Sequence, residues 1–543
     1  MRNPAARLRD LGERYIRRTC SDFPQWGSSL GFSRFESWLG GSDAKTRLAR
    51  LHFLEQLLAE AEALPASALT GDDWLDRRCF LSLLRTELLY GRDLERWRTN
   101  PQECCDGAVG AVFELVIRHA ENLPKARKAL EARLAAIPRF LKEGAAAVRR
   151  PVPIWTRLAV EACKGAGDFV LTIGETLAVS SPAPARTRRL ARAAAKAFAG
   201  YAASVSRKKQ GKPGSFSIGR ERFEELVRER TGLDWSLPEI EAEGRLLIAE
   251  LGKELEREAR KLGGRGSAAA ILARARDAWV PQASLLDLYT RSSAAWRDRV
   301  VRSGLYPVPP GESLKVTPVP DFMRDYFPTA AYSSPGAFEK RQRGIFWVND
   351  LGSIKKDPAE KLREERQHFA LELTSAHEGY PGHHLQFAIQ NRHPSRIRRL
   401  CSHAIFYEGW TMWCEKLAVQ QGWVTGPHAH LARLQQLHDA LWRAYRIVID
   451  CGLHSGKLTP GAAARMLVRG VGFTPARARA DVNWYTAAPT VPMSYLLGRL
   501  ELERVKDHLM KGEGWTLRKF HNWALSHGAV PWRWIEQAAG TTA

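Results

Sequence analysis

Apolar residues in the amino-terminal half of the chain recur every three or four positions, which is the pattern of amphipathic helices. From Lys125 to Val148, Ala, Leu and Ile follow this spacing between Arg, Lys and Glu. A second predicted helix runs from Pro238 to Leu262, with Ser236 placed to cap its first turn. The pattern therefore predicts successive helices over this half of the chain.

The carboxy-terminal half adds one clear strand signal to further helices. Gly344 to Asn349 is a short aromatic and β-branched stretch bounded by Gly and Asn-Asp, which predicts a strand. The predicted helices are Pro358 to Glu378, Arg396 to Gln421, Leu431 to Leu453, Thr459 to Gly470 and Val491 to Leu509. We therefore expect a mainly α protein with a small β element beside the helix that ends in His377 and Glu378.

Two stretches predict loops: Arg207 to Gly219, which is rich in Lys and Gly, and the proline-rich Tyr306 to Gly311. The second is richer in proline, and we place the domain boundary there. Residues 1–305 are expected to form a helical region that covers a cleft, and residues 306–543 a catalytic region.

Composition narrows the class of protein. Of the 543 residues, 44% are hydrophobic and 26% are charged, as in ordinary globular proteins. The first twenty residues carry charges throughout, and no apolar run approaches the roughly 18 residues of a membrane span. We therefore expect a soluble, cytoplasmic protein without a membrane partner. The eight cysteines form no C-x-x-C pair, which predicts neither a disulfide framework nor a thiolate zinc site.

The formal net charge of +23 could attract nucleic acid or acidic substrates. The basic residues are scattered along the chain instead of gathering in stripes. Nucleic acid is therefore not the expected partner.

The densest chemistry lies between His377 and His384. Zinc peptidases use H-E-x-x-H because histidines four apart share one helix face while Glu acts as general base. Here the next histidines, His383 and His384, stand six and seven positions after His377. Six residues of regular helix separate two side chains by roughly 9 Å of rise, which is too far for one ion. Pro381 and Gly382 should break the helix and fold one of these histidines back.

A third ligand is needed, because catalytic zinc sites commonly add one carboxylate to two histidines. The following helix offers Glu408 and Glu415, which lie on the same face. We prefer Glu408, whose aromatic neighbours and adjacent glycine suit a carboxylate drawn into a packed interior. Glu415 then becomes an orienting residue.

At these residues the chain resembles the bacterial domain-of-unknown-function family 885, whose hallmark is H-E-x-x-P-G-H followed by x-x-Q. His377, Glu378, Pro381, Gly382, His383 and Gln386 match it. The family varies at the position of His384, and the resemblance therefore implies His383 as the second ligand.

The resemblance extends beyond this motif, from about Tyr332 to Leu502. Glu408 to Trp410 resembles the family's E-G-W-A element, with Glu415 at its acidic position, and the stretch from Arg446 to His454 resembles R-L-V-V-D-T-G-L-H. The late motif R-Y-x-x-x-P-G-Q-A-x-x-Y-x-x-G keeps Tyr485, Pro489, Tyr495 and Gly498. Trp484 replaces its Arg, and Thr490-Val491-Pro492 replaces Gly-Gln-Ala.

What the resemblance implies is a multi-helical, zincin-like metallohydrolase that cleaves peptide bonds. One zinc ion per chain is expected on His377, His383 and Glu408, with Glu378 as general base. Tyr495, with Tyr485 behind it, is expected to stabilise the developing oxyanion. The residues expected around the metal or the substrate are His384, Glu415, Arg446, Asp450, His454 and Asn349.

Two further roles and the alternative functions are also expected. The strand from Phe346 to Asn349 could hold an extended peptide by edge pairing, and Arg446 and His454 bind a substrate carboxylate or brace the metal shell. Alternative functions are an amidase or a biosynthetic tailoring hydrolase acting on a non-peptide amide, for which Thr490 to Pro492 would reshape the pocket. A third reading is a basic helical binding protein with a degenerate site.

Overall fold

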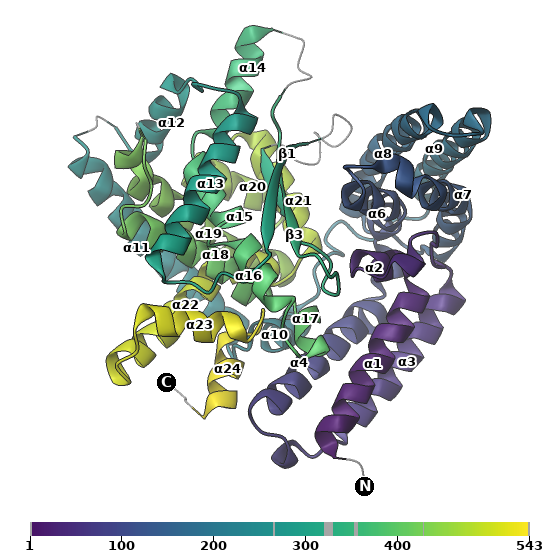
Figure 1. Cartoon of the computed structure of the whole chain (residues 1–543), viewed down its shortest axis with the longest axis horizontal. Coiled ribbons are helices and arrows are strands. Elements are labelled where there is room, and N and C mark those ends of the chain that lie inside the picture. Colours follow the sequence, from purple (N-terminus) through teal and green to yellow (C-terminus); the bar gives the residue numbers. More distant parts are fainter. Residues whose placement is uncertain (1–2, 264–265, 320–328, 352–356, 427, 541–543) are drawn as a thin grey trace. The chain divides into compact units, whose positions relative to one another are not determined.

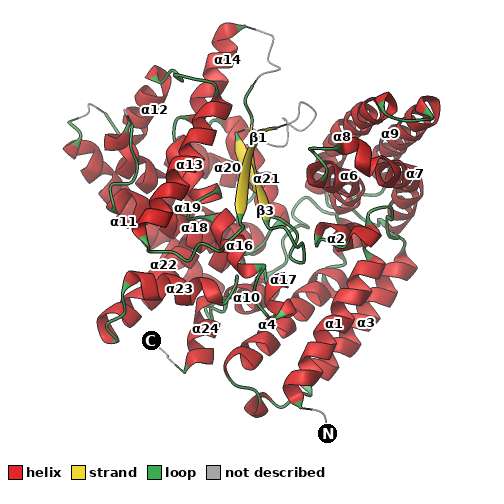
Figure 2. Ribbon diagram, in the orientation of Figure 1, coloured by secondary structure: helices red, strands yellow, loops and turns green. Residues whose placement is uncertain are grey.

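The computed structural model describes the whole chain except residues 1–2, 264–265, 320–328, 352–356, 427 and 541–543. Helices account for 72% of the residues and strands for 3%, so the mainly α prediction is confirmed (Figure 2). Among the described helices, none combines the length and the apolar composition that a membrane crossing requires.

The chain divides into two compact units within the first predicted loop and not at the proline-rich one. The first unit comprises Met1–Phe216 with Gly336–Glu339, and the second comprises Ser217–Pro335 with Lys340–Ala543. The expected boundary at 305/306 therefore falls inside the second unit. Packing explains the position of the boundary, because helices before residue 305 share a hydrophobic core with helices after residue 430. The proline content of a loop carries no information about such long-range packing.

The first unit consists of helices whose apolar faces pack on one another (Figure 1, purple to blue). Ile137, Phe140 and Phe169 are among its buried side chains. Its helices are α1 (Pro4–Asp22), α2 (Pro24–Ser29), α3 (Ala44–Glu62), α4 (Gly71–Leu88), α5 (Arg96–Thr99), α6 (Pro101–Arg118), α7 (Leu123–Ala147), α8 (Pro153–Val179) and α9 (Pro184–Ser206).

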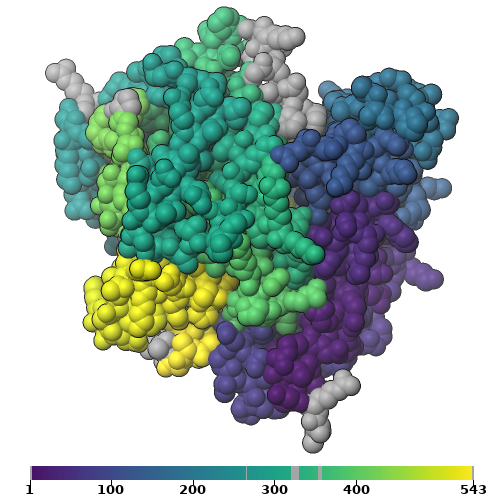
Figure 3. Space-filling view, in the orientation of Figure 1, coloured from purple at the N-terminus to yellow at the C-terminus, as the bar shows by residue number. Residues whose placement is uncertain are grey.

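The second unit carries the sheet and the histidine motif. Its helices are α10 (Arg220–Thr231), α11 (Leu237–Lys261), α12 (Ala268–Ala278), α13 (Leu285–Ser303), α14 (Pro358–Glu365), α15 (Leu371–Glu378), α16 (His383–Gln390), α17 (Arg396–Leu400), α18 (Ala404–Gln420), α19 (Ala432–His454), α20 (Pro460–Val471), α21 (Pro475–Ala487), α22 (Val491–Gly512), α23 (Leu517–Ser526) and α24 (Trp532–Ala539). In the space-filling view, α23 and α24 form the yellow surface of this unit (Figure 3).

One hydrophobic core joins α10 and α11 to α18, α19 and α22. Its side chains include Phe223, Leu251, Met412, Ile447 and Met493, all at most 7% exposed. The predicted cap of α11 is present, since Ser236 and Glu239 form a reciprocal capping box. This core holds α18, the helix that carries Glu408 and Glu415, in place.

The small sheet has the strand order β1-β3-β2 and places β3 in the centre. β1 (Ser313–Pro318) pairs with β3 (Arg343–Val348) in parallel, and β2 (Ala330–Ser333) pairs with β3 antiparallel. The predicted strand is therefore correct, but its expected role in edge pairing with a peptide is wrong. Both edges of β3 are already hydrogen-bonded to neighbours, which leaves β1 and β2 as the edge strands.

Helices α18 and α22 cross at two glycines that lie backbone to backbone. A Cβ atom on Gly409 would meet the carbonyl carbon of Gly498 at 2.4 Å, and one on Gly498 would meet the carbonyl oxygen of Ile405 at 2.0 Å. No larger residue fits at either position without separating the helices. The crossing holds Glu408, next to Gly409, close to Tyr495, one turn before Gly498.

We predict that Gly498→Ala lowers the free energy of unfolding by about 2 to 3 kcal/mol, because the added methyl group must push α18 and α22 apart. Chemical denaturation followed by circular dichroism measures this change. Gly512→Ala is the matched control on the same helix, since a Cβ there meets nothing within 4 Å. Equal stability of the two variants would contradict the close crossing.

Candidate metal centre

The expected break in the motif helix is present. α15 ends at Glu378, and α16 begins at His383. At Gly382 a Cβ atom would lie 1.9 Å from the carbonyl oxygen of His377 and 2.4 Å from that of Ala376. Only glycine therefore permits the chain to fold back so closely, and this contact returns His383 to the end of the helix that carries His377.

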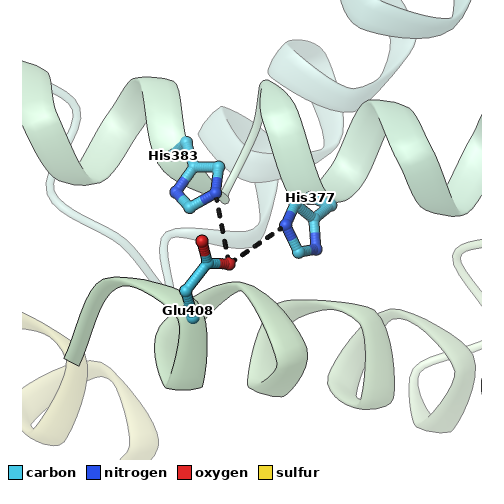
Figure 4. Close-up of side chains that lie close together, drawn as sticks. All are labelled: His377, His383 and Glu408. Carbon is cyan, nitrogen blue, oxygen red and sulfur yellow. Dashed lines mark ion pairs between the residues drawn. The ribbon is translucent and has the colours of Figure 1, made fainter. Parts of the chain in front are cut away.

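The break brings two histidines over one glutamate. His377 and His383 descend from α15 and α16, and Glu408 rises from α18 towards both rings (Figure 4). One potential ligand atom from each of the three residues lies within 4.8 Å of the others. All three residues are at most 9% exposed. The structure thus gathers the three side chains that the sequence singled out as ligands.

The distances in this cluster suit an ion better than they suit direct hydrogen bonds. Glu408 Oε2 lies 3.6 Å from His377 Nε2 and 3.6 Å from His383 Nε2. That separation is too long for a hydrogen bond, whereas two ligands of a tetrahedral zinc ion stand roughly 3.4 Å apart. Among the described residues, Glu408 Oε2 has no hydrogen-bond partner although it is buried. The residues present therefore fit a zinc ion.

His377 is oriented by a second carboxylate. Its Nδ1–H donates to Glu415 Oε1 at 2.6 Å, which leaves Nε2 directed at Glu408. Carboxylates that hold the outer nitrogen of a metal-binding histidine fix its tautomer in this way. Behind Glu415, the buried guanidinium of Arg499 pairs with Glu503 at 3.4 Å, and Lys416 pairs with the same Glu503 at 2.8 Å.

The buried charges shift the pKa values of the cluster in opposite directions. Burial lowers the pKa of His383 to about 4. Burial also acts to lower the pKa of His377, but the nearby Glu408 carboxylate and the hydrogen bond to Glu415 outweigh it and raise the pKa to about 10. For Glu408, burial acts to raise the pKa, but the nearby imidazoles of His377 and His383 overcome it and lower the pKa. Without an ion, a proton on His377 is the positive charge between the carboxylates.

Glu378 lies beside the cluster without joining it. Burial raises the pKa of Glu378 to about 7; His377 opposes this shift, and the carboxylates of Glu408 and Glu415 add to it. The main-chain N–H of Tyr332, on edge strand β2, donates a hydrogen bond to Glu378. The Glu378 carboxylate can therefore exchange a proton near neutral pH.

Tyr495 contacts the cluster from α22. Its hydroxyl group lies close enough to Glu408 to contribute to the lowered pKa of that carboxyl. Burial and the Glu408 charge raise the pKa of Tyr495 well above its ordinary value, so the hydroxyl keeps its proton.

His384 points away from the cluster into a polar network of its own. Its Nε2–H donates to Glu312 at 2.8 Å, and its Nδ1 accepts from the Tyr332 hydroxyl at 3.2 Å. Glu312 has a fully buried side chain that also accepts from Tyr380 and from Arg297. This network holds the first turn of α16 in place.

Arg446 and Tyr485 form a second polar group on α19 and α21. Arg446 Nε–H donates to the Tyr485 hydroxyl at 2.9 Å, and that hydroxyl donates to Asp481 at 2.7 Å. The Tyr485 hydroxyl thus donates its proton to Asp481, which leaves Tyr495 as the candidate tyrosine beside Glu408.

Asp450 and His454 pack at the start of α22. Asp450 is fully buried and accepts from the main-chain N–H of Met493 at 3.4 Å, and burial raises its pKa well above the usual range. His454 Nε2 lies 3.1 Å from the carbonyl oxygen of Tyr485, to which it can donate. These contacts brace α22 and α21 and are structural in kind.

Asn349 lies directly after β3 and is 6% exposed. Its main-chain N–H donates to the Thr329 carbonyl at 2.8 Å, and its side-chain oxygen accepts from the Leu351 N–H at 3.4 Å. The side chain therefore shapes the turn that leaves the sheet.

Sequence reasoning missed Glu312, Arg297 and Asp481. Each is a charged residue in a stretch without a motif, and nothing in its neighbours distinguishes it from a solvent-exposed charge. The sequence analysis names Tyr332 only as the start of the region that resembles the family, and that resemblance does not predict its contacts with His384 and Glu378.

The fold and the site define a mainly helical protein with a buried His-His-Glu cluster beside a three-stranded mixed sheet. The model of the family described as "Bacterial protein of unknown function (DUF885)" matches residues 24–538. The chain belongs to this family.

Two solved structures share the fold, and both are of proteins described as putative lipoproteins. The protein from Shewanella oneidensis, of unknown function, has a TM-score of 0.78 at 19% identity, with 98% of this chain and 99% of that chain covered. The protein from Colwellia psychrerythraea has a TM-score of 0.78 at 16% identity, with 99% of each chain covered. No functionally curated protein matches the chain.

The departure from the family's late motif has a visible local consequence. Thr490 occupies the place of the family's glycine and has a φ of 69°, in the left-handed region that favours glycine. Its buried hydroxyl has no hydrogen-bond partner among the described residues. Thr490 is therefore strained exactly where the family pattern carries no side chain.

We predict that Thr490→Gly raises the free energy of unfolding by about 1 kcal/mol, because it relieves the left-handed backbone of a β-branched residue. Thermal and chemical denaturation measure the change. Thr490→Ala is the control, since it removes the hydroxyl but keeps the backbone strain. An alanine variant at least as stable as the glycine variant would contradict this explanation.

Proposed function

We propose that this protein is a zincin-like, zinc-dependent hydrolase that cleaves amide bonds, above all those of peptides. The observation that carries the proposal is the position of Glu408 Oε2, 3.6 Å from both His377 Nε2 and His383 Nε2 and without another partner among the described residues. Two imidazoles and one carboxylate are the protein ligands of a known type of catalytic zinc site.

His377, His383 and Glu408 would hold the ion, which when bound lowers the pKa of a water molecule and polarises the substrate carbonyl. Glu378, whose pKa is raised to about 7, accepts the proton of the attacking water and passes it to the leaving amine. The Tyr332 main-chain N–H orients the Glu378 carboxylate. Tyr495 keeps its hydroxyl proton beside Glu408 and can donate to the oxygen on which negative charge develops.

A non-peptide amide remains the second candidate substrate. The observation that favours it is the altered start of α22, where Thr490 and Val491 stand in place of the family's Gly-Gln four residues before Tyr495. A peptide library assayed beside small amides distinguishes the two substrate classes. The third candidate, a basic binding protein with a degenerate site, requires salt-sensitive DNA binding without metal.

For the location of the enzyme we propose the cytoplasm, because all eight cysteines are free and a reducing compartment keeps thiols in this state. Fractionation of the native cells with an antibody against the chain measures this. Recovery with the envelope, as would suit a lipoprotein, would contradict it.

We predict about one zinc ion per chain after loading and dialysis, measured by elemental analysis. His377→Ala, His383→Ala and Glu408→Ala should each reduce zinc to a small fraction, because each removes one of three ligands. Glu415→Gln should weaken zinc binding about 10- to 100-fold through the orientation of His377.

His52→Ala, on an exposed face of α3, is the control and should retain full zinc content. A wild-type protein that holds no zinc, or loss of zinc in the His52 variant alone, would refute the assignment of the site.

We predict that Glu378→Gln keeps its zinc and lowers kcat about 10³-fold, because the amide cannot accept the proton of water. Peptide cleavage followed by mass spectrometry measures kcat. Glu372→Gln, on the same helix α15, is the matched control and should retain activity. Near-normal turnover in Glu378→Gln would exclude this residue as the base.

A further inference from the structure

A buried arginine lies near the metal cluster among four aromatic rings. Arg446 on α19 is 5% exposed. Its guanidinium carbon lies 4.1, 5.3, 5.4 and 4.6 Å from the ring centroids of Trp442, Trp484, Tyr485 and Tyr495. Aromatic faces stabilise the cation and hold its plane, but they offer no hydrogen-bond acceptor along its edges.

Only one edge of this guanidinium is used. Nε donates to the Tyr485 hydroxyl at 2.9 Å, and Nη2 lies 3.8 Å from Asp481. Nε and Nη2 share one edge of the planar group, and Nη1 belongs to the other. Nη1 is buried and has no hydrogen-bond partner among the described residues. A buried donor left in this way costs free energy unless a ligand completes it.

The charges around Arg446 leave an excess of one cation. Arg443 and Arg477 contact the same Trp442 ring at 3.8 and 5.1 Å. The carboxylates that interact with these three guanidiniums are Asp439, 3.7 Å from Arg443, and Asp481. Asp481 also accepts from Trp442 and Tyr485. An anion would balance the group, and a carboxylate matches the free guanidinium edge in shape.

The free edge lies close to the bond that would be cleaved. A single side chain, Tyr495, separates Arg446 from Glu408, because its ring contacts the guanidinium and its hydroxyl lies beside that carboxylate. Arg446 and the Glu408 carboxylate are therefore at most about 10 Å apart. An extended chain spans about 3.5 Å per residue, so one or two residues bridge this distance.

We propose that Arg446 binds a free carboxylate of the substrate, one or two residues from the scissile amide. The substrates are then N-acyl amino acids, including the carboxy-terminal end of peptides, and not internal peptide bonds. This inference rests on the proposed hydrolase function and narrows its substrate class. Trp484, in place of the family's arginine, gives Arg446 an aromatic neighbour instead of a second cation, which suits a single carboxylate.

Binding tests the inference without turnover. The zinc-loaded Glu378→Gln protein is mixed with pooled N-acetyl tripeptides, presented once as free acids and once as carboxamides, and the bound fraction is identified by mass spectrometry. A third pool contains N-acetyl amino acids. We expect acids to be retained at least tenfold better than amides, because only the acid fills the free edge of Arg446. The tripeptide and amino-acid pools distinguish peptide ends from small N-acyl amino acids.

Cleavage by the wild-type protein then separates the two proposals. We expect kcat/KM for the acids to exceed that for the matching amides by on the order of 100-fold, with release of one or two carboxy-terminal residues. Equal binding and equal cleavage of acids and amides would overturn the role of Arg446 while leaving the hydrolase proposal intact. Selective binding of acids without any cleavage would overturn the hydrolase proposal alone.

Variants test the residue itself. Arg446→Gln should abolish the preference for acids and raise KM more than it lowers kcat, and Arg446→Lys should restore part of the preference because it keeps the charge but not the fork. Arg245→Gln, at an exposed position of α11, is the control for the substitution and should bind as the wild type does. Because Arg446 is buried, thermal denaturation first shows whether each variant folds. If a variant does not fold, the comparison of acids with amides on the protein with intact Arg446 still tests the proposal. An acid preference that survives in a folded Arg446→Gln protein would refute the proposal.

Discussion

Three carboxyl groups, those of Glu378, Glu408 and Glu415, meet around two buried imidazoles, and the rest of the second unit is arranged to make this possible. Removing a carboxylate from water costs several kcal/mol unless a positive charge or hydrogen bonds compensate it. Here the compensation comes from His377, which is held between Glu408 and Glu415. A divalent cation between the same ligands would neutralise them more fully than one proton does. The same geometry would therefore favour binding of a divalent cation, as we propose.

The two glycines at the crossing of α18 and α22 position both Glu408 and Tyr495. Gly409 follows Glu408, and Gly498 follows Tyr495 by three residues, so the closest approach of α18 and α22 lies beside both functional side chains. A helix crossing through glycine is a rigid reference point, because the backbones themselves are in contact. The closeness of the Tyr495 hydroxyl to Glu408 therefore depends on packing that no single side chain supplies.

Much of this arrangement could be read from the sequence, because local chemistry determined it. Pro381 and Gly382 predicted a break that returns one of the next two histidines to His377, and the resemblance to the family implied that this histidine is His383. The long helix predicted from Pro358 instead divides into α14, a short 3-10 turn at Arg366–His368, and α15. The domain boundary and the central position of β3 could not be read, since both depend on contacts between residues far apart in the chain. Glu312 was missed for the same reason, as its partners come from α13, from the turn between α15 and α16, and from α16.

The hydrogen bond from the Tyr332 main chain to Glu378 ties the proton-accepting group to the pairing of two strands. Antiparallel neighbours alternate between inward and outward N–H groups, and Tyr332 pairs with Phe346 in the register that leaves its N–H turned outward. A slip of one residue between β2 and β3 would point the Tyr332 N–H towards β3. The N–H of the neighbouring residue that then faced outward would not lie at Glu378. Substitutions of the residue at 332 by anything other than proline can alter the contact with His384 but keep the main-chain donor. The acid–base behaviour of Glu378 is thus inherited from strand register, and insertions or deletions in the loops that flank β2 should disturb it more than point substitutions within the strand.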